Sequence, residues 1–100
     1  MLKQFAAKDK YLVGVISDTH GRLPQSVLAA FKDADLIIHA GDIGKQQIIE
    51  SLGRIAPTIG VQGNMDMGNW ASHLPAQEAV KVSKVMLHVI HDVNKIELKE

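Results

Sequence analysis

Hydrophobic residues along this chain gather in short runs that predict three strands. The runs cover residues 11–17 ("YLVGVIS"), 36–40 ("LIIHA") and 58–62 ("TIGVQ"). The first two are almost continuous in apolar residues, which is typical of strands in a parallel sheet that is covered on both faces. We therefore expect residues 11–17 to form a central, buried strand.

Two segments between these strands have the periodicity of amphipathic helices. The first begins near Pro24, a residue that is favoured in the first turn of a helix. Its apolar face would comprise Val27, Ala30 and Phe31. The second covers residues 45–55, where Gly53 weakens the last turn and Pro57 prevents continuation. Its apolar stripe would comprise Ile48, Ile49, Leu52 and Ile55.

The alternation of strands and helices predicts an α/β fold built on a parallel sheet, in a single domain over residues 1–100. Further along the chain, residues 79–82 and 85–90 are predicted strands that Ser83 and Lys84 would join as a β-hairpin. This turn lacks the glycine of the common two-residue turns, so the pattern leaves the register of the hairpin open.

Composition and charge exclude several classes of protein. The net charge is zero and no run of basic residues occurs, so no nucleic-acid patch is evident. The absence of cysteine excludes disulfides and thiolate metal sites. No apolar run approaches the roughly 18 residues of a membrane span, and the first ten residues lack the apolar core of a signal peptide. We expect a cytoplasmic protein without membrane partners.

Polar residues of a particular kind follow four of the predicted strands. Asp18 and His20 follow the first strand, Asp42 follows the second, Asn64 follows the third and His91 follows the last. Ligands of open α/β sheets bind in the crevice at the carboxyl ends of the strands. We therefore expect these five side chains to converge there.

This group of side chains offers oxygen and nitrogen ligands and no sulfur. Such a set suits manganese, iron, zinc or nickel better than calcium or copper. A carboxylate that bridges two ions is what a two-metal hydrolytic centre needs. Asp42, at the end of the second strand, is the candidate for the bridge.

The motifs "SDTHG", "HAGD" and "GN", followed by His91, occur here in that order. On these motifs the sequence resembles the calcineurin-like metallophosphoesterases, most closely the small phosphodiesterases of bacteria and archaea. The resemblance extends from Tyr11 to Val93. It implies a layered fold of sheets flanked by helices, of which this chain holds the first β-α-β-α-β unit and a hairpin.

The resemblance also implies a role for each motif residue. Asp18 and His20 would hold one metal, Asn64 and His91 a second, and Asp42 would bridge two divalent transition ions, manganese first among them. A metal-bound hydroxide would hydrolyse a small phosphodiester or another phosphate ester, with Asp42 and Asn64 as catalytic residues. Asn64 would also orient a phosphate oxygen.

The chain departs from the family pattern in two places. Many relatives have a histidine after the asparagine as the acid for the leaving group, whereas this chain has Met65. Asp66 is the nearest replacement, although a plain loop role fits it better. The family also continues past the position of His91 with a Gly-His-x-His segment and with strands of a second sheet. We therefore expect a C-terminally truncated chain, whether by truncation, by proteolysis or as an unusually short gene product. One flank of the first sheet would then be uncovered, where the chain could form a homo-oligomer.

Several other residues have weaker signals. Arg22 could bind a substrate phosphate from the first loop. His39 lies within an apolar strand, where a buried histidine could support the metal ligands. An ordinary structural role is expected for His88 in the last strand, and His73, before Leu74-Pro75, is expected to be a surface loop residue. Met65, Met67 and Trp70 are expected to pack the loop or to wall the cleft.

Two functions remain alternatives to a phosphoesterase. The family includes a subunit of the retromer coat that is thought to act through its surface, so a non-catalytic interaction module is one alternative. A nucleotide-binding domain is the weaker one, because the chain has neither a G-x-G-x-x-G nor a Walker-type loop. The physiological substrate stays open.

Overall fold

The three predicted parallel strands form one sheet in the computed structural model, which describes residues 2–5, 10–92 and 94. The strands are β2 (Val13–Ile16), β3 (Leu36–His39) and β4 (Thr58–Gly60), in the order β2-β3-β4. All pairs are parallel, with Val15 opposite Ile38 and Ile38 opposite Ile59. The α/β prediction is confirmed, and each strand is shorter than the apolar run that predicted it.

The position of β2 differs from the expectation of a central, buried strand. β3 is the central strand, and all four of its residues are buried. β2 lies at the edge of the sheet, and Val15 is 64% exposed. The two apolar runs are nearly alike in sequence, so composition alone could not distinguish a central strand from an edge strand.

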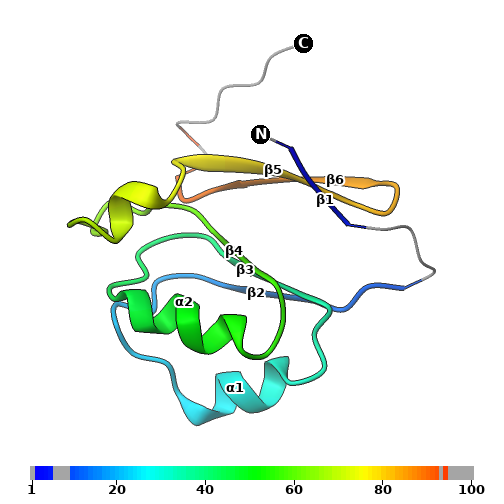
Figure 1. The fold of residues 1–100 in the computed structure, drawn as a ribbon, viewed down its shortest axis with the longest axis horizontal. Helices are drawn as coiled ribbons and strands as arrows, with labels where there is room; N and C mark the ends of the chain where they lie inside the picture. The colour runs from blue at the N-terminus through cyan, green and yellow to red at the C-terminus, as the bar shows by residue number, and fades with distance from the viewer. Residues whose placement is uncertain (1, 6–9, 93, 95–100) are drawn as a thin grey trace.

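Both predicted helices cover one face of this sheet (Figure 1). Helix α1 (Gln25–Phe31) begins after Pro24, and helix α2 (Gln46–Gly53) buries Ile48 and Leu52. The stripe of α2 is confirmed, whereas Ala30 of α1 is exposed, contrary to the prediction. α1 instead approaches β2 through its last residue: a Cβ at Gly14 would lie 2.9 Å from the ring of Phe31.

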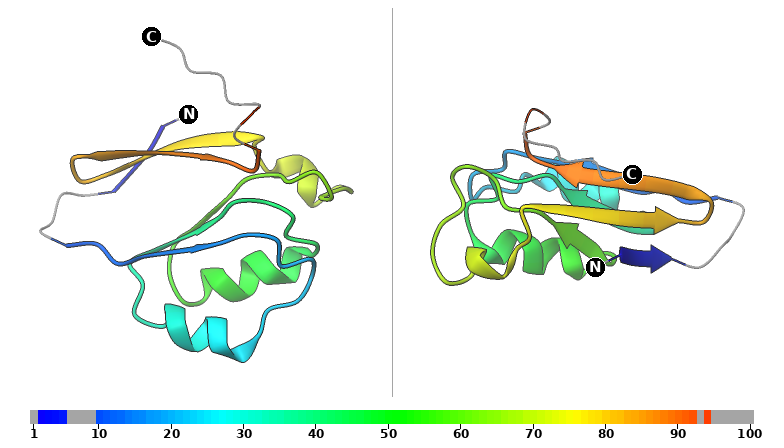
Figure 2. Two further views of the ribbon diagram at one scale, coloured as in Figure 1. Left: turned by 180° about the vertical axis from the view of Figure 1, so that it is seen from behind. Right: turned by 90° about the horizontal axis from the view of Figure 1, so that it is seen from above.

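A second three-stranded sheet covers the other face. Its strands are β1 (Leu2–Phe5), β5 (Gln77–Val82) and β6 (Val85–Ile90), in the order β1-β5-β6 (Figure 2). The β5–β6 hairpin is confirmed, and its register places Val82 opposite Val85. Ser83, the first turn residue, has φ +54°, the conformation for which such turns prefer glycine.

Strand β1 was not predicted from the sequence. It pairs in parallel with β5, with Leu2 opposite Ala79. The expectation of an uncovered flank of the first sheet is therefore wrong, because β1 and the hairpin form a second sheet that packs against it. Four residues at the start of a chain give too short a pattern to predict a strand whose partner is more than seventy residues away.

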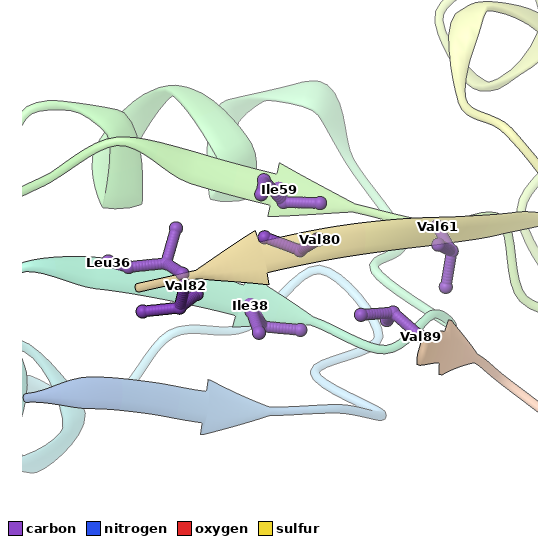
Figure 3. Close-up of a cluster of buried hydrophobic side chains, with 7 residues drawn as sticks. All are labelled: Leu36, Ile38, Ile59, Val61, Val80, Val82 and Val89. Carbon is purple, nitrogen blue, oxygen red and sulfur yellow. The ribbon is translucent and has the colours of Figure 1, made fainter. Parts of the chain in front are cut away.

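The main hydrophobic core fills the space between the two sheets (Figure 3). The first sheet and the residue after β4 contribute Leu36, Ile38, Ile59 and Val61, and the second sheet contributes Val80, Val82 and Val89. A second cluster between the first sheet and the helices includes Ile37, Ile43, Ile48 and Leu52. The first sheet is thus held on both faces, which fixes the positions of the loops at its carboxyl edge.

In the described part of the chain, no helix has both the length and the apolar character needed to cross a membrane.

Candidate metal centre

The loops that carry the predicted ligands lie at one end of the molecule. In Figure 1 the chain leaves β2, β3, β4 and β6 toward the same side, and α2 begins there as well. His91 is the first residue after β6. Parallel pairing of β2, β3 and β4 places their carboxyl ends together, and the antiparallel return of β6 brings His91 to them.

The backbone at three predicted ligands adopts the left-handed conformation. The φ angles are +58° at Asp18, +49° at His20 and +56° at Asp42. Non-glycine residues seldom have positive φ, and each such conformation costs on the order of 1 kcal/mol or more. Such strain persists where the surrounding structure imposes it, and it is concentrated at functional sites.

Backbone hydrogen bonds hold the first two loops side by side. The N–H of Asp18 donates to the carbonyl of Gly41 at 2.9 Å, and the N–H of His20 donates to the carbonyl of Asp42 at 3.0 Å. A Cβ at Gly63 would collide with the backbone N of Asp42. The third loop therefore lies closer to Asp42 than a residue with a side chain would allow.

Three of the five predicted ligands form a compact cluster. One ligand atom each from Asp18, Asp42 and His91 lie within 4.8 Å of one another. His20 is beside them, with its Nε2 3.8 Å from Oδ1 of Asp18 and 4.0 Å from Oδ2 of Asp42. Asp42 is buried, whereas the Asp18 and His20 side chains are half exposed, so the cluster faces solvent on one side.

Hydrogen bonds orient the donor atoms of His91 and Asp42. Nδ1 of His91 lies 2.9 Å from the carbonyl of Ala40 and so carries the proton, which leaves the Nε2 lone pair free, 3.4 Å from Oδ2 of Asp42. Oδ1 of Asp42 accepts the N–H of Met65 at 2.9 Å. Metal-binding histidines commonly have this arrangement, so the residues present fit a divalent metal.

The protonation state of Asp18 also suits a metal ligand. A hydrogen bond from the Ser17 side chain holds the pKa of Asp18 below its usual value; burial opposes this shift, and the nearby His91 and His20 add to it. The carboxylate is therefore ionised at neutral pH and available as a ligand.

Asn64 and Arg22, the other two predicted site residues, are both exposed. Asn64 is exposed and lines a cavity of about 370 Å³ together with His91, Gln62 and Asp92. Arg22 is exposed, and in the part of the chain that the structure describes its side chain forms no hydrogen bond or ion pair with the cluster. The metal role of Asn64 and the substrate role of Arg22 stay predictions.

His39 is fully buried and linked to the first loop. Its Nδ1 accepts the N–H of Gly41 at 3.1 Å, so its Nε2 donates to Oγ1 of Thr19 at 3.0 Å, and that hydroxyl donates to the carbonyl of Ile43 at 2.8 Å. Burial lowers the pKa of His39 to about 4, against the smaller effects of Asp66 and other carboxylates. The neutral ring thus ties together the loops that carry Asp18, His20 and Asp42.

Asp66 has a structural importance that sequence reasoning underrated. It is buried, and its carboxylate accepts the N–H groups of Ile43, Gly44 and Gly63 at 2.9 to 3.2 Å. Burial alone would raise the pKa of Asp66, but these hydrogen bonds outweigh it and the pKa lies below the usual value. An ionised, fully bonded carboxylate cannot replace the missing acid. In the sequence, only its position shortly after Gly63-Asn64 indicated that Asp66 belongs to this region.

The remaining predictions for this region have mixed outcomes. Trp70 packs against the second core cluster, but Met65 and Met67 are 61% and 71% exposed and do not pack the loop. His88 is exposed and lies 2.8 Å from Oε1 of Gln77 across the hairpin, which is a structural role as expected. His73 is exposed in a 3₁₀ helix, η1 (Ala71–His73).

Comparison with known proteins gives consistent results. Residues 11–100 match the family model described as calcineurin-like phosphoesterase superfamily domain. Over 85 residues the chain is 41% identical to a probable metallophosphoesterase of Methanocaldococcus jannaschii and 38% identical to one of Methanothermobacter thermautotrophicus. These alignments cover 80% of this chain but only 42% and 49% of the relatives, so the chain spans less than half of their length.

Solved structures with a similar fold include Vps29 from Chaetomium thermophilum and a single mutant of Vps29 from Entamoeba histolytica. The TM-score is 0.68 for both, at 18% and 21% sequence identity. The matches cover 79% and 88% of this chain and 45% and 52% of the Vps29 chains. At these identities the likeness concerns the fold alone.

Proposed function

Because this chain belongs to the calcineurin-like phosphoesterase superfamily, we propose that it carries out metal-dependent hydrolysis of phosphate esters, and of phosphodiesters in particular. The family uses divalent metals, and we assign Asp18, His20, Asp42, Asn64 and His91 to two of them, with Asp42 shared. Manganese is the first choice, before iron, zinc and nickel. The observation that carries the proposal is the convergence of Asp18, Asp42 and His91 from three strand ends.

The residues of the chain prepare the site in several ways. Asp42 is held by the N–H of Met65 so that Oδ2 faces His20 and His91. The hydrogen bond from His91 to Ala40 keeps the Nε2 lone pair directed into the cluster. Divalent ions at this position would neutralise the charge of the phosphate and lower the pKa of a bound water.

Protonation of the leaving group must differ from that in relatives that have a histidine after the asparagine. Met65 has no proton to give, and Asp66 is ionised and bonded to backbone N–H groups. Protonation by solvent therefore favours esters whose leaving group is a weak base, such as an aryl alcohol.

The test has two measurements on the purified protein. Isothermal titration calorimetry measures the binding of Mn²⁺, and the hydrolysis of bis(p-nitrophenyl) phosphate in the presence of Mn²⁺ measures activity. We expect Asp42→Asn to weaken Mn²⁺ binding at least about 10-fold and to abolish hydrolysis, since metal sites depend on the charge of their ligands. Asp33→Asn makes the same chemical change at an exposed position away from the cluster and should leave both unchanged. Hydrolysis that persists without metal, or in Asp42→Asn, would refute the proposal.

An interaction module is the second candidate, and one observation favours it. The edges of β2 and β6 have no strand partner among the described residues, and Val15 is largely exposed. Unpaired strand edges are common docking surfaces for other polypeptides. A protein that binds no divalent ion and copurifies stoichiometrically with another chain would support this function and exclude the first.

A further inference from the structure

The turn that follows β4 places a methionine beside the candidate metal centre. The N–H of Met65 donates to Oδ1 of Asp42 at 2.9 Å, so the backbone of Met65 contacts the carboxylate that we assign to both metals. Met65 is nevertheless 61% exposed. An apolar side chain therefore begins next to the ligand cluster without being packed into the core.

The backbone on both sides of Met65 is fixed by hydrogen bonds. The N–H of Asp66 donates to the carbonyl of Gly63 at 3.3 Å and closes a turn with Asn64 and Met65 at its centre. The carboxylate of Asp66 accepts the N–H groups of Gly63 and Ile43, each at 2.9 Å. The position of Met65 relative to the cluster is thus set, while its side chain remains free to move.

A fixed backbone with an unpacked methionine side chain suits contact with a ligand. Methionine is unbranched and polarizable, so it adapts to apolar groups of varied shape. A single exposed apolar residue needs no explanation, but Met67, two residues further along the same loop, is 71% exposed. An apolar group bound at the metals would remove part of this surface from water, which is favourable.

A neighbouring part of the site has the opposite character. Asn64, directly before Met65, lines the cavity of about 370 Å³ that also includes His91, and Met65 does not line this cavity. Most of its other lining residues are polar, namely Gln62, Gln77 and Asp92 beside Ala76 and Ile90. Adjacent residues of one turn therefore offer a polar cavity and an apolar surface. A phosphodiester carries two organic groups, so such a site can distinguish between them.

We propose that Met65 determines specificity by contacting an apolar alcohol group of a phosphodiester bound at the metal centre. This inference rests on the proposed phosphoesterase function and names its substrate class: amphiphilic diesters in which one esterified alcohol is a hydrocarbon chain. A polar group at the same place would give up hydrogen bonds to water, and the methionine side chain would not replace them.

The test compares two probes that have the same anionic head. Isothermal titration calorimetry measures the binding of hexylphosphonate and of methylphosphonate to the protein loaded with Zn²⁺. Neither probe is hydrolysed, so the measurement does not depend on turnover. We expect hexylphosphonate to bind about 10-fold more tightly, which is less than complete burial of the longer chain would give.

Matched variants locate the preference. Met65→Gln introduces a polar side chain of similar length and keeps the backbone N–H that binds Asp42, so the ratio of the two affinities should fall below about 2. Met86→Gln makes the same change at a methionine of β6 that is 57% exposed and lies outside the turn, and should leave the ratio unchanged. Circular dichroism would verify that both variants are folded.

Nuclear magnetic resonance gives a second readout of the same contact. The chain has four methionines, whose methyl groups can be labelled with carbon-13. The signal of Met65, assigned by its absence in Met65→Gln, should shift when hexylphosphonate is added to the protein loaded with Zn²⁺. The signal of Met86 should not shift.

The possible results separate this inference from the proposed function. If neither phosphonate binds, the metal centre does not hold a phosphate group and both proposals are overturned. Equal binding of the two phosphonates would overturn the inference alone. A preference for hexylphosphonate that Met65→Gln leaves intact would do the same, because the apolar contact would then lie elsewhere.

Discussion

Two buried polar side chains, Asp66 and His39, determine how the loops of the candidate metal centre are held. Neither is a member of the ligand cluster. Both bind backbone or hydroxyl groups of the loops that carry Asp18, His20 and Asp42. At the scale of the residue, the site therefore depends on hydrogen bonds that lie beneath it.

Replacing Asp66 by Asn should destabilise the protein by roughly 2–4 kcal/mol. The amide has one acceptor oxygen, so it would leave buried N–H groups of Ile43, Gly44 or Gly63 without a partner. Urea unfolding would measure the change. Asp33→Asn is the matched control at an exposed site and should change stability by less than about 0.5 kcal/mol. An equal effect of the two substitutions would contradict the role of Asp66.

The low pKa of His39 predicts a pH dependence of stability. The folded protein holds this ring neutral down to about pH 4, whereas in the unfolded chain it takes up a proton below about pH 6.5. As the pH falls through this window, only the unfolded state gains the proton, so the free energy of unfolding decreases. The loss is at most about 3 kcal/mol and is complete near pH 4.

Urea unfolding between pH 7 and pH 4.5 would check this prediction. The lowered pKa values of Asp18 and Asp66 keep those carboxylates ionised in this range, so their titration does not add to the pH dependence. His39→Gln removes the titrating group. Its stability should be lower at pH 7 but should depend less on pH. A variant with the full pH dependence of the parent would mean that another group is responsible.

At the scale of the element, two glycines should respond to alanine in opposite ways. Gly14 lies in β2, where a Cβ would come within 2.9 Å of the Phe31 ring of α1, so Gly14→Ala should cost roughly 1–3 kcal/mol. Gly53 is the last residue of α2, and a Cβ there would meet nothing within 4 Å. Gly53→Ala should raise stability by up to about 1 kcal/mol.

Thermal unfolding of the two alanine variants, followed by circular dichroism, would measure both effects. The pair is its own control, because the chemical change is the same and only the surroundings differ. If Gly14→Ala were as stable as the parent, the close approach of α1 to β2 would not be a constraint on the fold.

At the scale of the whole molecule, one side of the two-sheet structure is open. A cavity of about 350 Å³ is lined by Val13 of β2 and Val85 of β6, and another of about 240 Å³ by Val15 and Leu87. Both strands are edges of their sheets. Apolar, unpaired edges together with a net charge of zero favour association between copies.

Val15→Lys should therefore reduce self-association, because a lysine on an edge strand opposes pairing with another edge. Sedimentation velocity at several protein concentrations would show a lower fraction of oligomer than in the parent. Ala29→Lys adds the same charge on the exposed surface of α1 and should leave the oligomer fraction unchanged. A parent protein that remains monomeric at high concentration would refute the prediction.

The sequence by itself determined the elements near one another in the chain and the types of ligand. The apolar runs of β2, β3 and β4, the stripe of α2 and the hairpin were all predicted, because periodicity depends on neighbouring residues. Asp18, Asp42 and His91 could be selected because ligand chemistry is a property of the side chain and parallel strands end at one edge.

The tertiary structure alone decided which strand lies at the centre, where β1 pairs, and what Asp66 and His39 bind. The run of residues 11–17 looks as buried as that of 36–40, but only the pairing places β2 at the edge and exposes Val15. β1 finds its partner in β5, and Asp66 binds N–H groups that lie up to 23 positions before it. Such contacts depend on which segments meet in space, and local sequence patterns do not contain that information.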